Sequence, residues 1–480
     1  MEHFDVLIVG AGLSGIGAGY HVQTMCPSKR YAILEGRPRL GGTWDLFRYP
    51  GIRSDSDMHT LGYSFRPWTA AKAIADGPAI LEYVRDTAEH YGIDRHIRFN
   101  RRVTGASWSS VEAKWTIEVS DTEQDSVETY TCNFLFVCSG YYDYDAGYTP
   151  KFEGLDDFNG RIVHPQKWTE DIDYANKRVV VIGSGATAVT LVPAMAAKAA
   201  HVTMLQRTPT YVVSRPAEDR IANVLRAGLP EKLAYGVTRW KNVVFGQAFY
   251  NLCQKAPGPM RKLIMSGVRK EVGDGVDVDT HFNPPYDPWD QRLCLVPDAD
   301  LFESLRSGSA SVETGHIERF VPEGIRLRDG RTLPADIVVT ATGLQVKVMG
   351  GIEIRVDDEP FVPAESMSYK AMMFSDVPNL AMCFGYTNAS WTLKADLTSL
   401  YVCRLINHMD ENGHRMCVAR KQDGVEPEDF IGLKAGYISR ASALLPKAGS
   451  KAPWKLKQNY FVDLFQLKLS KVDDGVMQFS

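Results

Sequence analysis

The chain has 480 residues, which is too long for one ordinary hydrophobic core, so we expect two or three domains. A hydrophobic fraction of 44% and a charged fraction of 23% are typical of a globular protein. The formal net charge of −4 gives no general attraction to nucleic acid or to an acidic membrane surface.

The first predicted elements form a strand, a glycine loop, a helix and a second strand. Phe4–Val9 is an apolar run that ends at Gly10-Ala11-Gly12-Leu13-Ser14-Gly15. A helix is expected from about Ser14 to Met25, followed by the strand Tyr31–Leu34. The chain shows no signal-peptide pattern and no apolar run near the roughly 18 residues of a membrane span. We therefore expect a cytoplasmic protein without a transmembrane segment.

The first loop has the full G-x-G-x-x-G pattern of a dinucleotide site. Gly10 permits the tight turn, Gly12 lets the backbone approach a pyrophosphate, and Gly15 lets the helix pack closely on the sheet. The phosphates would meet the free N–H groups at the start of the helix. Glu35, about 20 residues beyond the loop, offers a carboxylate to ribose hydroxyls.

A glycine pair follows soon afterwards, in Gly41-Gly42-Thr43-Trp44. Such a pair allows the backbone to approach a second part of the same cofactor closely. Trp44 packs either on a flavin or only on the protein core, and the residue types alone favour neither.

The strand, loop and helix pattern returns at Arg178–Ile182, followed by Gly183-Ser184-Gly185-Ala186-Thr187-Ala188. The next strand is Val202–Leu205, and Arg207 and Thr208 follow it where the first unit has a carboxylate. A carboxylate would repel a 2′-phosphate, whereas arginine and threonine bind one through charge-assisted hydrogen bonds. We therefore predict FAD at the first loop and NADPH at the second.

These patterns predict an α/β fold with two Rossmann-like dinucleotide-binding domains, the second inserted in the first. The FAD-binding domain would comprise residues 1–147 and 343–480, and the NADPH-binding domain residues 148–342. Residues 216–286 show no strand pattern, so we expect a helical insertion there. Within Glu231–Lys270 there are eight basic residues and one acidic residue. That segment is either a solvated helical cover or a surface for peripheral membrane contact.

Eight cysteines are scattered along the chain, and none forms a C-x-x-C or C-x-x-x-x-C pair. We interpret them as small buried hydrophobic residues in a reducing compartment, and we predict no metal site. Two dinucleotides on one chain imply hydride transfer from NADPH to flavin. A disulfide reductase would need a close cysteine pair, so the electrons are expected to pass to O2 or to another protein.

The segment before the second loop carries a family resemblance. Phe158–Thr169 matches the pattern F-x-G-x-x-x-H-x-x-x-W-[P/D], the fingerprint of Baeyer–Villiger monooxygenases, except for Thr169 at its last position. Asp336–Gly343 is similar to the D-x-x-x-x-A-T-G element of flavin monooxygenases, with looser spacing. Nearly the whole chain resembles this family, in particular its mycobacterial ethionamide-activating branch. The stretches that carry the resemblance are Thr43–Asp57, Val179–Ala194, Pro288–Pro297 and Gly385–Leu397.

The resemblance implies NADPH- and O2-dependent insertion of oxygen beside a ketone carbonyl through a C4a-peroxyflavin, giving an ester. S-oxidation of thioethers or thioamides would be a secondary activity. The family's active-site arginine falls on Arg292 and its carboxylate partner on Asp55, with Asp57 as the alternative. A fixed cation suits a developing oxyanion. Many relatives have a lysine before the arginine that helps to hold the NADPH phosphate; Gln291 stands there, so we expect weaker discrimination against NADH.

Several alternatives stay open at this point. His164 and Trp168 of the fingerprint form either a hinge between the domains or a structural contact. Trp391 and the run Met372–Phe374 belong either to the substrate pocket or to the core. The rival functions are a flavin monooxygenase that oxygenates only nitrogen or sulfur, and an NADPH-dependent flavin reductase without oxygenation. The sequence leaves the physiological substrate and the oligomeric state open.

Overall fold

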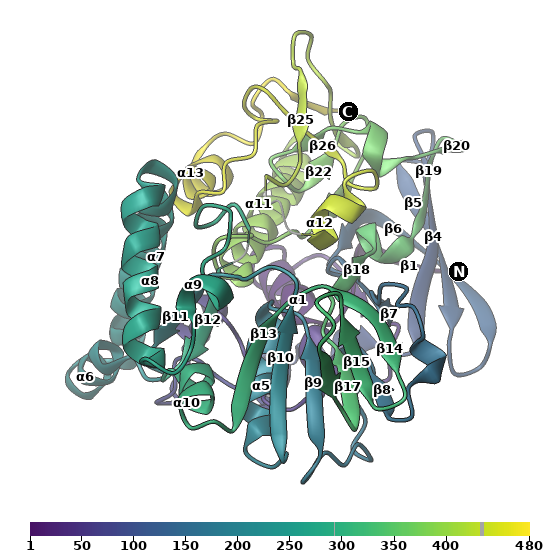
Figure 1. Ribbon diagram of the computed structural model, residues 1–480. Helices are drawn as coiled ribbons and strands as arrows, with labels where there is room; N and C mark the ends of the chain where they lie inside the picture. Colours follow the sequence, from purple (N-terminus) through teal and green to yellow (C-terminus); the bar gives the residue numbers. More distant parts are fainter. Residues whose placement is uncertain (292, 433–435) are drawn as a thin grey trace.

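The computed structural model describes residues 1–291, 293–432 and 436–480. Two sheets lie next to each other, and each contains a parallel β–α–β unit (Figure 1). The predicted α/β class with two Rossmann-like units is thereby confirmed. The two units are β1 (Glu2–Val9), α1 (Leu13–Met25) and β2 (Tyr31–Leu34), and β9 (Arg178–Ile182), α5 (Ala186–Ala196) and β10 (His201–Gln206).

The larger sheet has the strand order β20-β19-β4-β5-β6-β1-β2-β3, and β23 also pairs with β6. β1 lies between β2 and β6 and is parallel to both. Its last four residues are buried, because both faces of a parallel sheet are covered. The other strands are β3 (Ile97–Arg98), β4 (Arg101–Ser109), β5 (Lys114–Asp121), β6 (Ser126–Val137), β19 (Glu353–Val356), β20 (Glu359–Pro360) and β23 (Leu380–Met382).

The smaller sheet has the order β13-β10-β9-β17-β8, and its neighbouring strands are all parallel. Its remaining strands are β8 (Arg161–Val163), β13 (Ala310–Thr314) and β17 (Ile337–Thr340). An antiparallel group of β14 (Ile317–Val321), β15 (Gly324–Leu327) and β16 (Thr332–Pro334) follows β13. The carboxyl ends of β9 and β10 are where ligands bind in open α/β sheets.

The chain passes between the two sheets twice, and the two passages pair with each other. β7 (Tyr142–Gly147) lies antiparallel to β18 (Leu344–Val346). The backbone N–H of Tyr148 donates to the carbonyl of Gly343 at 3.1 Å. This two-stranded ribbon therefore links the units on one side of the molecule.

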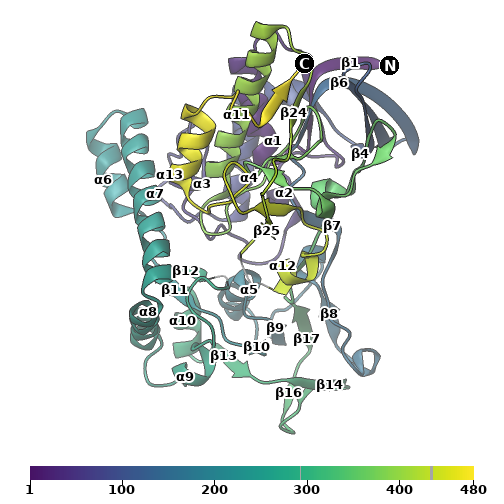
Figure 2. The same cartoon turned by 90° about the horizontal axis from the view of Figure 1, so that it is seen from above.

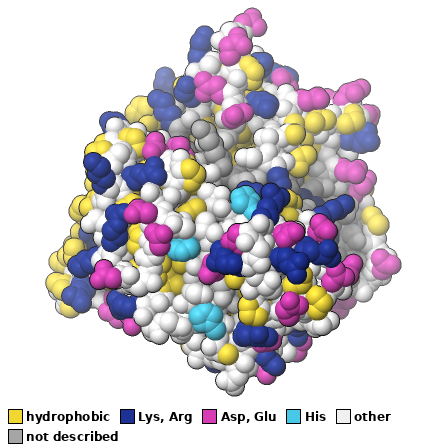
Figure 3. All heavy atoms as spheres, viewed as in Figure 1, with side chains coloured by type: hydrophobic (Ala, Val, Ile, Leu, Met, Phe, Trp, Pro, Cys, Tyr) yellow, Lys and Arg dark blue, Asp and Glu magenta, His cyan; other side chains and the backbone are white. Residues whose placement is uncertain are grey.

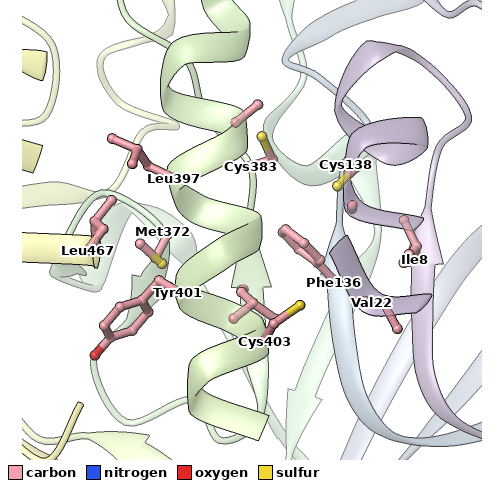
Figure 4. Close-up of a cluster of buried hydrophobic side chains, with 14 of the residues drawn as sticks. Ile8, Val22, Phe136, Cys138, Met372, Cys383, Leu397, Tyr401, Cys403 and Leu467 are labelled. Carbon is pink, nitrogen blue, oxygen red and sulfur yellow. The ribbon is translucent and has the colours of Figure 1, made fainter. Parts of the chain in front are cut away.

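Helices of the larger unit pack on its sheet, and α1 and α11 (Trp391–Asn412) enclose a core with β1 and β6 (Figure 4). Ile8, Val22, Phe136 and Tyr401 of these four elements are buried there. The other helices of this unit are α2 (Thr43–Leu46), α3 (Met58–Leu61), α4 (Gly77–His90), α12 (Gly436–Ala441) and α13 (Tyr460–Asp463). A π-helical turn over Leu464–Leu469 continues α13.

The helical insertion lies along one side of the molecule (Figure 2). As expected from the sequence, it is mainly helical, and its long members are α7 and α8. Its helices are α6 (Arg220–Gly228), α7 (Glu231–Lys255), α8 (Pro257–Val272) and α9 (Val278–His281). A further helix, α10 (Asp300–Arg306), comes later in the chain.

Short strand pairs complete the fold. They are β11 (Val212–Arg215) with β12 (Cys294–Pro297), β21 (Ser368–Tyr369) with β22 (Met373–Phe374), β24 (Cys417–Ala419) with β27 (Met477–Phe479), and β25 (Pro427–Asp429) with β26 (Lys447–Gly449). In the described part of the chain, no helix combines the length and the apolar character that crossing a membrane requires. All eight cysteines are buried and reduced, as predicted.

Candidate active site

A single large cavity of about 1210 Å³ is lined by both glycine loops. It also receives side chains from the ribbon β7–β18 and from the start of α11. The predicted residues that line it are Gly10, Gly12, Leu13, Ser14, Glu35, Gly42, Thr43, Trp44, Asp55, Gly183, Ser184, Gly185, Ala186, Thr187, Arg207, Thr208 and Gln291. Arg292 lies outside the described residues. The cavity therefore gathers nearly every residue that the two patterns singled out.

The first loop needs glycine at Gly10 and Gly15 for different reasons. Gly10 has a φ of 99°, and a Cβ there would lie 2.8 Å from the carbonyl oxygen of Cys138. A Cβ on Gly15, which is buried behind the cavity lining, would lie 1.8 Å from the oxygen of Gly10. No side chain caps the start of α1, whose N-cap is Gly12. Its N–H groups are thus available to a phosphate.

Glu35 holds the first loop in place. Its two carboxylate oxygens accept the backbone N–H of Ala11 at 2.7 Å and that of Arg37 at 3.0 Å. Burial raises the pKa of Glu35, while the two backbone hydrogen bonds lower it. The carboxylate therefore fixes the loop and still lines the cavity, where a ribose hydroxyl can share its oxygens.

The glycine pair brings a second backbone segment against the first loop. A Cβ on Gly42 would lie 3.0 Å from the Cα of Gly12, so the two segments approach as closely as glycine allows. Thr43 Oγ1 lies 3.4 Å from Tyr144 Oη, and Trp44 both lines the cavity and packs on the core. The two interpretations of Trp44 thus apply together.

A buried ion-pair cluster that the sequence did not reveal supports this segment. The carboxylate of Asp45 is fully buried and binds Arg37 at 2.7 Å, Arg39 at 3.1 Å and Arg48 at 2.6 Å. Arg37 also donates to the carbonyl of Gly42 at 3.2 Å and lines the cavity. Arg37 is therefore an additional candidate for cofactor binding, and in the sequence it lies two residues after Glu35.

The second loop repeats the geometry of the first. Gly183 has a φ of 138°, and a Cβ there would lie 2.4 Å from the oxygen of Ala341. α5 begins at Ala186, its N-cap residue is Gly185, and no side chain caps the helix. Ser184 Oγ donates to the carbonyl of Thr208 at 3.0 Å, so the segment after β10 lies beside the loop. The exposed side chain of Arg207 stands at the same edge of the cavity.

The choice between Asp55 and Asp57 depends on what surrounds each carboxylate. Asp57 is the N-cap of α3 and accepts the N–H of Thr60 at 3.1 Å and Nδ2 of Asn242 at 2.9 Å. It does not line the cavity, whereas Asp55 does. The geometry thus favours Asp55 as the carboxylate that faces a ligand.

The fingerprint segment supports the ribbon that links the two units. His164 Nε2 lies 3.3 Å from the carbonyl oxygen of Gly343, and its Nδ1 accepts the N–H of Gln166 at 3.2 Å. A Cβ on Gly147 would lie 1.9 Å from the imidazole. A Cβ on Gly160 would lie 2.5 Å from the oxygen of Asp336. The fingerprint glycine and histidine are therefore positioning residues at the passage between the units.

The apolar residues that the sequence left unassigned divide between the cavity and the core. Trp391 lines the cavity, and its Nε1 donates to Ser14 Oγ at 2.7 Å. Met372, Met373 and Phe374 are fully buried in the core and do not line the cavity.

Two cysteines far apart in the sequence meet beside the first loop. Cys138 and Cys383 hydrogen-bond to each other, and Figure 4 shows both between α11 and α1. The premise that the chain lacks a close cysteine pair is therefore wrong. Burial raises the pKa of Cys138 well above its usual value, whereas the hydrogen bond with Cys138 lowers the pKa of Cys383. The described residues contain no cluster of His, Cys, Asp or Glu that could hold a metal ion.

Comparisons with known proteins agree with this geometry. The family described as flavin-binding monooxygenase-like matches residues 74–262, and an NAD(P)-binding Rossmann-like domain matches residues 8–76. The chain is similar in fold to an oxidised steroid monooxygenase bound to NADP, with a TM-score of 0.74, 22% identity and 99% of each chain covered. It is also similar to OTEMO in complex with FAD and NADP, with a TM-score of 0.71, 22% identity, and 87% of this chain and 86% of that chain covered.

The relatives in sequence are much nearer. The FAD-containing monooxygenase EthA of Mycobacterium tuberculosis is 55% identical over 481 residues, which is 100% of this chain and 98% of EthA. Identity at this level over the full length, together with the two glycine loops in one cavity, shows the family: the chain belongs to the FAD-containing monooxygenases of the EthA branch.

Proposed function

We propose that this flavin monooxygenase uses NADPH and O2 to convert a ketone into an ester, with oxidation of thioether or thioamide sulfur as a secondary activity. One oxygen atom of O2 would enter the ester, the other would leave as water, and NADPH would supply two electrons. The observation that carries the proposal is the single cavity in which both glycine loops meet Asp55 and Gln291, the residue before Arg292.

The lining of this cavity suits the two cofactors. FAD would be held by the first loop, Glu35 and the Gly42–Trp44 segment, and NADPH by the second loop with Arg207 and Thr208. Bound FAD supplies the two-electron carrier that NADPH reduces and that activates O2. The uncapped starts of α1 and α5 would bind the pyrophosphates.

Arg292 and Asp55 would be the catalytic pair. A guanidinium offers a permanent charge and several donors to an oxyanion that develops on the substrate, and an adjacent carboxylate would orient it. Because Gln291 carries no charge, the 2′-phosphate would be bound mainly by Arg207 and Thr208.

We also propose that the two sheets mark the binding domains, with residues 1–147 and 343–480 for FAD and residues 148–342 for NADPH. The strand order supports this division, because residues 161–340 contribute every strand of the smaller sheet. The paired passages β7 and β18 lie at its two boundaries.

The product distinguishes this proposal from its rivals. The enzyme would be incubated with NADPH, 18O2 and separate linear, cyclic and aryl ketones, with a thioamide in parallel. We expect an ester that carries one labelled oxygen atom from at least one ketone class. Sulfur oxidation without any ester would indicate a heteroatom monooxygenase, and hydrogen peroxide equal to the NADPH consumed would indicate a reductase.

A matched pair of variants tests the catalytic carboxylate. Asp55→Asn should retain reduction of the flavin by NADPH and lose ester formation by about 100-fold or more. Asp57→Asn is the control, because asparagine caps a helix as well as aspartate does. Equal loss in both variants, or loss only in Asp57→Asn, would contradict the assignment.

A further inference from the structure

Exposed large hydrophobic side chains concentrate in the helical insertion and in the C-terminal segment. Among the described residues, thirteen of eighteen exposed large hydrophobic side chains lie between 221 and 263 or between 461 and 469. A monomeric protein rarely exposes such a concentration without a binding role. We call this set the apolar face: Ile221, Val224, Leu229, Leu233, Val237, Trp240, Val244, Phe245, Leu252, Leu263, Phe461, Phe465 and Leu469.

The apolar face is separate from the side of α7 that the fold uses. Leu233, Val237, Trp240 and Val244 follow one another at helical spacing along a single outer stripe of α7. Arg239, on the opposite side, is buried and binds backbone carbonyls of the larger unit. α7 therefore packs on the protein through one side and exposes the apolar stripe on another.

The face continues from the insertion onto the C-terminal segment. The ring of Trp240 stacks on Phe461 at 6.2 Å and meets Tyr460 at 6.0 Å. Phe461, Phe465 and Leu469 recur every fourth residue through α13 and the turn that follows. Two segments more than 200 residues apart in sequence thus form one surface.

Exposed lysines lie on the same two long helices, in a chain whose formal net charge is −4. Residues 231–270 carry eight basic residues and one acidic residue. Arg239, Lys241 and Arg269 form ion pairs with carboxylates of other segments. The exposed lysines are Lys232, Lys255, Lys262 and Lys270. The left side of Figure 3, over α7 and α8, shows hydrophobic and basic side chains together with some acidic ones. Exposed aliphatic and aromatic residues next to lysines are typical of helices that lie in the interface of an anionic bilayer.

A second copy of the chain fits this surface less well. A two-fold interface would place the apolar face against itself and bring the two sets of lysines together. Like charges at such a contact oppose association, whereas anionic headgroups neutralise them. The charge therefore favours a lipid surface.

We propose that the apolar face binds peripherally to anionic lipid bilayers, with α7 lying in the plane of the membrane interface. At 1.5 Å per residue α7 offers a contact about 37 Å long. The apolar side chains would enter the boundary between headgroups and acyl chains, and the lysines would bind lipid phosphates. The inference does not depend on which substrate the enzyme oxidises.

Sedimentation of the holoenzyme with vesicles tests the proposal. We expect binding to vesicles of phosphatidylcholine with phosphatidylglycerol, weaker binding to phosphatidylcholine alone, and a loss of affinity as salt is raised. Trp240→Glu should weaken binding about tenfold or more. Val127→Glu, at a more exposed valine of β6, is the control and should bind as the wild type does.

A second pair of variants separates charge from apolar contact. Lys255→Gln should weaken binding to anionic vesicles about fivefold, and Lys421→Gln, exposed elsewhere, should not. Phe465→Glu repeats the apolar test on the C-terminal segment in case Trp240→Glu misfolds. Absence of vesicle binding would overturn the proposal. If the protein also self-associates and Trp240→Glu abolishes that self-association, the apolar face binds a second copy instead.

Discussion

At the scale of single residues, two positions that correspond in the two units carry opposite charges. Glu35 follows β2, is buried and accepts two backbone N–H groups. Arg207 follows β10, is exposed and stands beside a loop that Ser184 and Thr208 hold together. Similar backbones therefore present a carboxylate in one unit and a cation in the other, which is the difference between binding a ribose hydroxyl and binding a 2′-phosphate.

Arg207→Ala should raise KM for NADPH about 10- to 100-fold, because a charge-assisted hydrogen bond contributes about 1.5–3 kcal/mol. KM for NADH should change little, since NADH has no 2′-phosphate. Arg207→Lys, which keeps the charge but not the bidentate geometry, should lie between the wild type and alanine. Steady-state kinetics with both coenzymes measure the difference, and a parallel rise for the two would remove Arg207 from phosphate binding.

At the scale of elements, the ribbon β7–β18 depends on a neutral histidine. His164 Nδ1 accepts a backbone N–H, so its Nε2 carries the proton and donates to Gly343. Protonation would place a second N–H at Nδ1, directly against the N–H of Gln166. Burial lowers the pKa of His164, in agreement with this geometry.

The stability of the protein should therefore depend on His164 in mildly acidic solution. Below the ordinary histidine pKa of about 6.5 the unfolded chain binds the proton more readily than the folded one, so stability falls as the pH falls. His164→Gln should remove part of the stability that the protein loses between about pH 7 and pH 5. Thermal unfolding against pH measures the slope, with the exposed His90→Gln as control. An unchanged slope in His164→Gln would contradict a neutral His164 at this passage between the units.

Local patterns predicted the two β–α–β units and the helical insertion, whereas contacts between residues far apart in the chain could not be predicted. Each glycine loop is a short segment whose strand, turn and helix can be recognised together, so both β–α–β units and the helical insertion were predictable. The hydrogen bond from Asn242 to Asp57 spans 185 residues of the chain. The contact of Ser14 with Trp391 spans 377 residues, and the meeting of Cys138 with Cys383 likewise requires the whole fold. Pairings of this kind leave no pattern in a single sequence.

At the scale of the whole molecule, α7 joins the helical insertion to the larger unit. Arg239 Nη1 donates to the carbonyls of His59 at 2.9 Å, Thr60 at 3.2 Å and Gly62 at 2.8 Å. Its Nη2 lies 3.5 Å from a carboxylate oxygen of Asp396. Burial raises the pKa of Asp396, but His21 and Arg239 more than offset it, so the pKa is lowered. One buried guanidinium thus binds backbone carbonyls of α3 and a carboxylate of α11, both in the larger unit.

Arg239→Met tests this clamp, because methionine fills similar space and removes the charge. Three carbonyls and a buried carboxylate would each lose one partner, which should lower the free energy of unfolding by about 3–5 kcal/mol. Hydrogen exchange should rise first in α7, because the helix would separate from α3 before the sheets unfold. Arg269→Met is the control, since Arg269 is exposed on α8 and binds the exposed Asp279, and it should cost less than about 1 kcal/mol. A loss in Arg239→Met no larger than in this control, in urea unfolding, would show that apolar packing alone holds the insertion in place.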